Sequence, residues 1–85
     1  MNSRALRSFW ACFARLPVVI QDVARAKYTL WRRDPFHGSL QFKELRPRLW
    51  SVRISSGYRA LARREGEDVV WFWIGTHAEY DRLIG

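Results

Sequence analysis

A histidine at the start of a predicted helix is the residue in this chain best suited to acid–base chemistry. Thr76 is followed three residues later by Glu79, which is the pattern of a helix capping box, and His77 falls in the first turn of that helix. The helix dipole and nearby arginines disfavour the charged imidazolium. A neutral imidazole accepts a proton near pH 7, so His77 is a candidate general base. The alternative is a surface histidine in a helix cap.

Two arginines are predicted to face each other in a β-hairpin. Ser55-Ser56-Gly57 suits a three-residue turn with Gly57 in the left-handed conformation, and this register places Arg53 opposite Arg59. Directly opposed like charges destabilise a hairpin by up to about 1 kcal/mol, which suggests that an anion binds between them. Paired guanidinium groups match the oxygens of a phosphate. The alternative is a solvated basic face whose arginines point into water.

Further basic residues and one tyrosine extend this candidate site. The basic residues expected to bind substrate around the arginine pair are Lys43, Arg46, Arg48 and Arg63. Tyr80 could stack on a base or donate a proton, and its spacing to Leu83 and Ile84 fits core packing equally well. The chain carries 15 Lys and Arg against 8 Asp and Glu, a formal net charge of +7. This charge favours a polyanionic partner such as nucleic acid, and an acidic protein would also fit.

Other chemistries lack the residues that they need. The two histidines lie in separate segments, and His37 is interpreted as a turn residue. Cys12, the one cysteine, falls on an apolar helical stripe, so neither a metal site nor a thiol nucleophile is expected. We expect no cofactor and a reducing, cytoplasmic location. The apolar run from Leu16 to Ile20 is too short to span a membrane.

The 85 residues, 48% of them hydrophobic, predict a single domain over residues 1–85. A helical hairpin is expected in the first third, with Ser8 as the N-cap of the first helix. The second helix is expected to begin at Pro17 and to end at Asp34-Pro35. The apolar stripe predicted for the second helix consists of Val19, Val23, Ala26 and Leu30, with Ile20, Ala24 and Trp31 beside it.

Four short runs then predict a small antiparallel sheet. The runs are not all purely apolar; they span Leu40 to Leu45, Leu49 to Ile54, Tyr58 to Arg64, and Val69 to Ile74, and brief turns join them. The last run is apolar at both parities, which is typical of a strand inside a sheet. Asn2 to Arg7 shows no good alternation and so gives no clear indication of a strand. The predicted fold class is α+β: an N-terminal helical hairpin packed on an antiparallel sheet, followed by a short C-terminal helix.

The core is expected to lie between the helices and one face of this sheet. The hairpin register places Ile54 opposite Tyr58, Val52 opposite Ala60, and Ser51 opposite Leu61. The positions whose periodicity points to this layer are Phe9, Phe13, Val23, Leu30, Val52, Ile54, Tyr58, Val70 and Phe72.

From Phe9 to Ile84 the chain resembles the RelE/ParE superfamily of bacterial type II toxins. Leu49 to Ala60 is similar to the second and third strands of RelE-type toxins, and Ile74 to Glu79 is similar to the catalytic-histidine segment of YafQ-type toxins. The resemblance implies a ribosome-associated mRNA endonuclease or a gyrase inhibitor. It also implies an acidic, partly disordered antitoxin that wraps the toxin and represses the shared operon, so that operator DNA is bound only through the antitoxin.

The resemblance also implies roles for particular residues. Arg59 matches the strand arginine that contacts the scissile phosphate, Arg53 matches a basic strand position, and His77 matches the general base. Ser51 stands where RelE-type nucleases have a lysine, Tyr80 is shifted from their C-terminal tyrosine, and their arginine after the last strand is absent. The expected function is a metal-independent mRNA endoribonuclease. The alternatives are a non-enzymatic ParE-type gyrase inhibitor and an inert basic binding module of the same fold.

Overall fold

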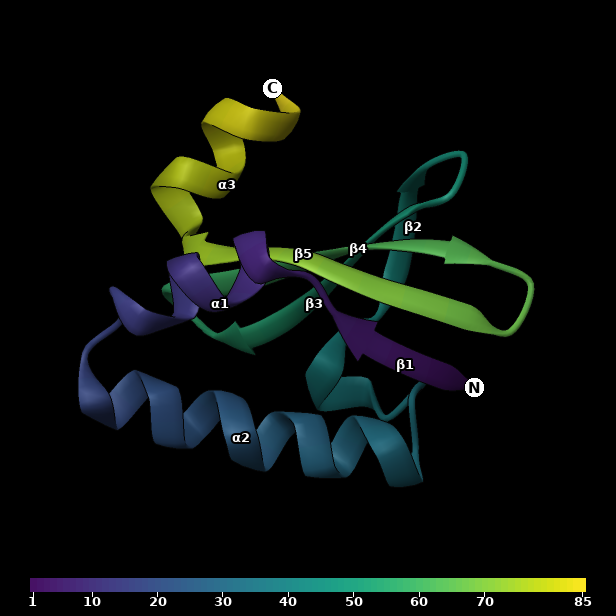
Figure 1. Ribbon diagram of the computed structural model, residues 1–85, viewed down its shortest axis with the longest axis horizontal. Coiled ribbons are helices and arrows are strands. Elements are labelled where there is room, and N and C mark those ends of the chain that lie inside the picture. The colour runs from purple at the N-terminus through teal and green to yellow at the C-terminus, as the bar shows by residue number, and fades with distance from the viewer.

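The computed structural model describes residues 1–85 and has the predicted α+β class. The strands are β1 (Asn2–Ala5), β2 (Lys43–Arg46), β3 (Leu49–Ser55), β4 (Tyr58–Glu65) and β5 (Asp68–Thr76), and the helices are α1 (Arg7–Ala14), α2 (Val18–Arg33) and α3 (His77–Ile84) with a short 3-10 turn η1 (Gly38–Leu40). The strand order is β1-β5-β4-β3-β2. Figure 1 shows α2 along one side of the sheet and α3 on the other.

The N-terminal strand is a correction to the sequence prediction. Asn2–Ala5 pairs with β5 in parallel, so the sheet is mixed rather than purely antiparallel. The strand is held by backbone pairing: beyond the ladder itself, the Asn2 N–H donates to the Glu67 carbonyl at 2.7 Å and the Leu6 N–H to the Trp71 carbonyl at 2.9 Å. Its side chains bury little apolar surface, which is why an apolar alternation could not reveal it.

The first helix begins at Arg7, two residues earlier than an N-cap at Ser8 predicts. Leu6 is the N-cap and offers no side-chain cap. The Ser8 hydroxyl instead donates to the Phe72 carbonyl at 2.9 Å, which ties α1 to β5. The second helix follows Pro17 and ends before Asp34, whose N–H donates to the Leu30 carbonyl, so its predicted limits are confirmed.

The buried stripe of α2 is rotated relative to the prediction. Ala24 and Trp31 are its buried residues, whereas Val19 is 71% exposed and Ala26 is also exposed. The sequence is apolar over more than one face of this helix, so periodicity alone did not select the face that meets the sheet.

The inward face of β5 also differs from the prediction. Val69, Trp71 and Ile74 are buried, whereas Val70 and Phe72 are only half-buried. A bulge causes this change, because Leu61 pairs with Trp73 and Ala62 pairs with Trp71, which leaves Phe72 as the extra residue. The strand lies inside the sheet as predicted, between β1 and β4.

Most of the other predicted core residues do meet the core. Phe13, Val52 and Ile54 are buried, while Phe9, Val23, Leu30 and Tyr58 are partly buried against them. Leu40 and Phe42, which the prediction omitted, are also buried in this core.

Candidate functional site

The two arginines of the β3–β4 hairpin are paired as predicted. Arg53 lies opposite Arg59, and Leu49 lies opposite Arg63 further along the same ladder. The turn itself differs from the prediction, because Ser55 rather than Ile54 lies opposite Tyr58. A register shift between Arg53 and Ser55 absorbs the extra residue. Gly57 therefore does not need the left-handed conformation, and the one glycine with positive φ is Gly66.

The predicted capping box begins α3. The Glu79 N–H donates to Thr76 Oγ1 at 3.1 Å, and the Thr76 N–H donates to Glu79 Oε1 at 3.0 Å. The Thr76 backbone and side-chain hydrogen bonds hold the pKa of the Glu79 carboxyl below its usual range. The His77 N–H donates to the Gly57 carbonyl at 2.8 Å, so the first residue of α3 is attached to the hairpin turn.

The imidazole of His77 is held by a neighbour on its own helix. Its Nδ1 lies 3.1 Å from Asp81 Oδ2, one turn further along α3. The side chain is 42% exposed, so the ring is open to solvent. Its centroid lies 5.6 Å from the centroid of the Tyr80 ring. Sequence reasoning missed Asp81, although its position four residues after His77 is the spacing of side chains that meet on a helix.

Tyr80 connects the histidine to the arginine pair. It is 7% exposed, and the guanidinium carbon of Arg59 lies 5.9 Å from its ring centroid. The Nη1 atom of Arg59 is buried and has no hydrogen-bond partner. A buried N–H without an acceptor carries a desolvation cost. His77, Tyr80, Arg59 and the opposing Arg53 therefore form one group, which we call the basic site.

Gly75 lies opposite Arg59 on β5, and two side chains approach its backbone closely. A Cβ atom at position 75 would lie 2.5 Å from Trp73 Cζ2 and 2.8 Å from Glu79 Oε1. The Trp73 indole and the capping carboxylate therefore both approach the backbone of Gly75, and a side chain there would displace them.

The remaining basic residues lie at varying distances from the basic site. Lys43 faces Ser51, on the strand position two residues before Arg53. Arg46 Nη2 donates to the Ile84 carbonyl, so this arginine holds the end of α3.

Arg48 and Arg63 lie at the opposite end of the sheet. Both have a guanidinium nitrogen 3.9 Å from Glu65 Oε1. Arg63 is four residues from Arg59 along β4, a separation of about 13 Å in an extended strand. The structure thus brings together four of the eight predicted site residues and leaves Arg48 and Arg63 outside the group.

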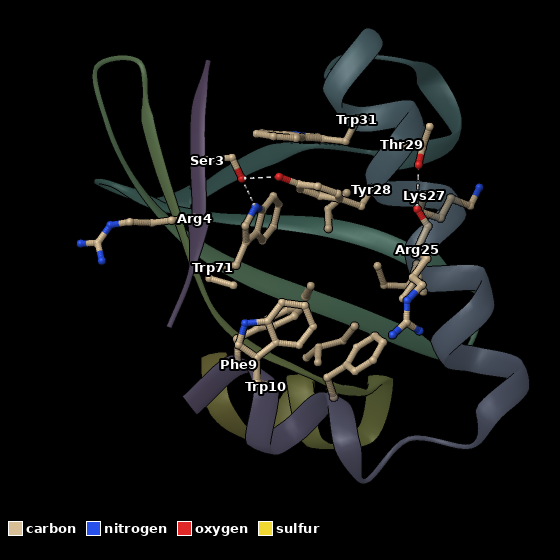
Figure 2. A pocket seen from close by; sticks show the side chains of 17 residues that line it. Ser3, Arg4, Phe9, Trp10, Arg25, Lys27, Tyr28, Thr29, Trp31 and Trp71 are labelled. Atoms are coloured by element: carbon tan, nitrogen blue, oxygen red, sulfur yellow. Dashed lines mark hydrogen bonds between the residues drawn. The ribbon is translucent and has the colours of Figure 1, made fainter. Parts of the chain in front are cut away.

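A hollow lined by residues of β1, α1, α2 and the sheet lies apart from the basic site. Figure 2 shows aromatic rings around it, and the Ser3 hydroxyl accepts hydrogen bonds from Tyr28 Oη and from Trp71 Nε1, each at 3.0 Å. These contacts bind the N-terminal strand to α2. None of the four residues of the basic site lines this hollow.

Two classes of feature are absent from residues 1–85. No group of three or more His, Cys, Asp or Glu side chains is placed to hold a metal ion. No helix has the length and apolarity that a membrane crossing requires. Cys12 is a free, half-buried thiol that packs against the core, and His37 caps the 3-10 turn by accepting from the Ser39 N–H.

A family model and solved structures both match this chain to toxins. The family model of the ParE-like toxin domain matches residues 19–82. The YoeB/ParE toxin from Agrobacterium tumefaciens has a TM-score of 0.68 at 20% identity, over 91% of this chain and 99% of that chain. A search of curated protein sequences found no significant match.

Two toxin–antitoxin complexes contain chains of the same fold. The RelBE2 complex from Mycobacterium tuberculosis gives a TM-score of 0.67 at 23% identity, over 89% of this chain and 96% of that chain. The RelB–RelE complex from Methanococcus jannaschii gives 0.74 at 10% identity, over 95% of this chain and 98% of that chain.

Proposed function

This chain belongs to the ParE-like toxin family, and from that premise we propose that it is the toxin of a toxin–antitoxin system and cleaves mRNA without a metal ion. One observation carries the choice of reaction. The guanidinium of Arg59 and the imidazole of His77 both lie beside the Tyr80 ring, so a cationic donor and a candidate base share one site. Cleavage of a phosphodiester by a neighbouring hydroxyl is favoured by a base that takes the hydroxyl proton and by a cation that stabilises the charge on the phosphate.

The proposed reaction is an attack by the RNA 2′-hydroxyl on the adjacent phosphorus. The new bond joins O2′ to phosphorus, and the bond from phosphorus to O5′ breaks. His77 Nε2 takes the 2′-proton, because Nδ1 is engaged with Asp81. Arg59 and Arg53 stabilise the charge on the phosphoryl oxygens, and solvent protonates the leaving O5′. DNA lacks the nucleophile and is not a substrate.

The test compares wild type with His77→Gln on translating ribosomes programmed with a defined mRNA. Removal of a positioned general base is expected to lower the single-turnover rate by about 10² to 10⁴. The cap depends on Thr76 and Glu79, so the variant should keep its fold and its binding of RNA. The 5′ fragments should end in 2′,3′-cyclic phosphate. Cleavage by His77→Gln at the wild-type rate would remove the histidine from the mechanism.

An antitoxin is the proposed protein partner. Solved chains of this fold occur in RelB–RelE complexes, and the net charge of +7 favours an acidic partner. Co-expression with the adjacent gene should restore host growth and yield a complex whose association slows at high salt. Harmless expression of the chain alone, with nothing co-purifying, would contradict this part of the proposal.

Inhibition of gyrase is the second candidate function. It is favoured by Ser51, which is 2% exposed and stands where RelE-type nucleases carry a lysine, and by the pairing of Arg48 and Arg63 with Glu65. Both features reduce the number of free basic side chains that could bind or cleave RNA. A supercoiling assay separates the candidates: inhibition of gyrase without cleavage on ribosomes would favour the inhibitor over the nuclease.

A further inference from the structure

Trp73 lies on the same face of the sheet as the arginine pair. It is two residues before Gly75 on β5, and Gly75 pairs with Arg59 on β4. Residues two apart on a strand, and residues paired across two strands, share a face of the sheet. Trp71 belongs to the opposite face, because a bulge separates it from Trp73, and its ring points into the hollow beside α2 (Figure 2).

The indole of Trp73 covers the backbone next to Arg59. A Cβ atom at Gly75 would lie 2.5 Å from Trp73 Cζ2 and 2.9 Å from Trp73 Cη2. Gly75 is buried, although it has no side chain of its own. Paired residues of antiparallel strands lie about 5 Å apart. The indole therefore adjoins the basic site.

The ring of Trp73 is not used for aromatic packing within the chain. The four other tryptophans each pair with at least one further aromatic ring; these are Trp10, Trp31, Trp50 and Trp71. Trp73 forms no such pair, and no guanidinium group lies over it. An aromatic ring at the site is thus left without an aromatic partner.

Part of this indole is accessible from outside. Trp73 is half-buried. Its Nε1 makes no hydrogen bond within the chain, and it is not one of the buried unpaired atoms, which are Trp31 Nε1 and Arg59 Nη1. A molecule bound at the arginine pair can therefore reach the Trp73 indole.

We propose that Trp73 stacks on a base of the RNA that is bound at the basic site. The inference rests on the proposed function, because that function supplies RNA as the ligand. If Arg53 and Arg59 hold a phosphate, the attached nucleotide brings a flat aromatic ring to the neighbouring indole. Stacking of a base on an aromatic side chain strengthens binding by about tenfold and tolerates any base, since every base has a π face. Trp73 is then a substrate-binding residue that positions the RNA without selecting its sequence.

A matched pair of trinucleotides tests this contact without relying on cleavage. The first is 2′-O-methyl adenosine trinucleotide, in which the methyl groups block the nucleophile, and the second is the same backbone without bases. Each is titrated into the full chain, and the indole N–H signals of the five tryptophans are followed by ¹⁵N–¹H NMR. The signal that is missing from Trp73→Phe identifies Trp73. The trinucleotide with bases should move this signal and bind about tenfold more tightly than the abasic one.

Two tryptophans provide a matched pair of variants. Trp73→Leu removes the aromatic ring beside the basic site, whereas Trp10→Leu removes a 52% exposed ring on α1 that lines the hollow. Trp73→Leu should bind the two trinucleotides with equal affinity, and Trp10→Leu should keep the tenfold difference. Trp73→Phe, which keeps an aromatic ring, should keep most of that difference.

Cleavage on programmed ribosomes supplies a second measurement. Stacking is equally strong before and during the reaction, so it contributes to binding and not to the chemical step. Trp73→Leu should therefore raise the half-saturating toxin concentration about tenfold and leave the single-turnover rate at saturation unchanged. His77→Gln should show the opposite pattern, because it removes the base and keeps the stacking ring.

Three results would overturn the proposal whether or not the chain cleaves mRNA. They are equal affinity of wild type for the two trinucleotides, a Trp73 signal that neither trinucleotide moves, and an unchanged affinity difference in a folded Trp73→Leu. Base-dependent binding by a wild-type chain that does not cleave would support the contact and reject only the nuclease reaction. If Trp73→Leu unfolds, the two trinucleotides on wild type still decide, because Trp73→Phe assigns the signal.

Discussion

His77 Nδ1 and Asp81 Oδ2 lie 3.1 Å apart on consecutive turns of α3, and this contact determines which imidazole nitrogen is free. If Nδ1 carries the proton and donates it to Asp81, Nε2 is the nitrogen that can accept one. The four-residue spacing places both side chains on one face of the helix, and the capping box fixes where that helix begins.

A change in the tautomer of His77 is therefore the direct effect expected from replacing Asp81. In Asp81→Ala the Nδ1–H form loses its acceptor, and ¹⁵N shifts of the imidazole should show a larger share of the Nε2–H tautomer. Single-turnover cleavage should fall about tenfold, far less than for a buried aspartate, because Asp81 is 62% exposed.

Asp81→Asn is the matched control, because its amide oxygen can still accept from Nδ1. It should retain the wild-type tautomer and most of the cleavage rate. If Asp81→Ala keeps the wild-type tautomer, Asp81 does not orient the ring.

Replacing Arg59 should weaken both binding and chemistry, whereas replacing Arg63 should weaken only binding. Arg59 has the buried, unpartnered Nη1 beside Tyr80, and Arg63 lies near Glu65 at the far end of the strand. Arg59→Ala should lower the single-turnover rate at saturating substrate by about 10². Arg63→Ala should leave that rate unchanged and reduce the salt dependence of RNA binding. Equal effects of the two substitutions on the rate would contradict the assignment of the basic site.

The stability of α3 should depend on pH through Glu79. Its pKa is lowered in the folded chain because of the hydrogen bonds from Thr76, so the stabilisation is present above the ordinary value of 4.5. It is lost as the pH falls from 4.5 through the lower folded value. Glu79→Gln should therefore show a smaller drop in thermal midpoint between pH 5 and pH 3 than wild type does.

Asp22 is exposed and its side chain makes no hydrogen bond or ion pair, so it supplies the control for that measurement. Asp22→Asn should follow the wild-type pH dependence. An unchanged pH dependence in Glu79→Gln would mean that the cap does not contribute to folding.

The bulge in β5 predicts unequal costs for two core substitutions. Ile54 is 4% exposed within the core, and Ile54→Ala should cost about 2 to 5 kcal/mol of unfolding free energy. Phe72→Ala should lower the unfolding free energy by less, because Phe72 is the half-buried extra residue of the bulge. Urea denaturation of both variants measures the difference, and a larger loss for Phe72→Ala would place its ring in the core.

Local interactions were open to prediction from sequence. The capping box at Thr76 and Glu79 depends on a spacing of three residues, and the opposition of Arg53 and Arg59 depends on a short hairpin. Contacts between residues close in the chain leave few alternative geometries, so residue types and spacing were sufficient. The limits of α2 were predicted for the same reason, from Pro17 and Pro35.

Contacts between distant segments were decided by the tertiary structure. The parallel pairing of β1 with β5 joins residues 66 positions apart, such as Asn2 and Asp68, and no local pattern encodes that choice of partner. The bulge at Phe72 changed which side chains of β5 face inward, since adding one residue to a strand exchanges its two faces. The use of Arg46 to hold the Ile84 carbonyl likewise needs the sheet and α3 in place. The sequence by itself determined the capping box and the arginine pair, and the tertiary structure decided that they meet around Tyr80.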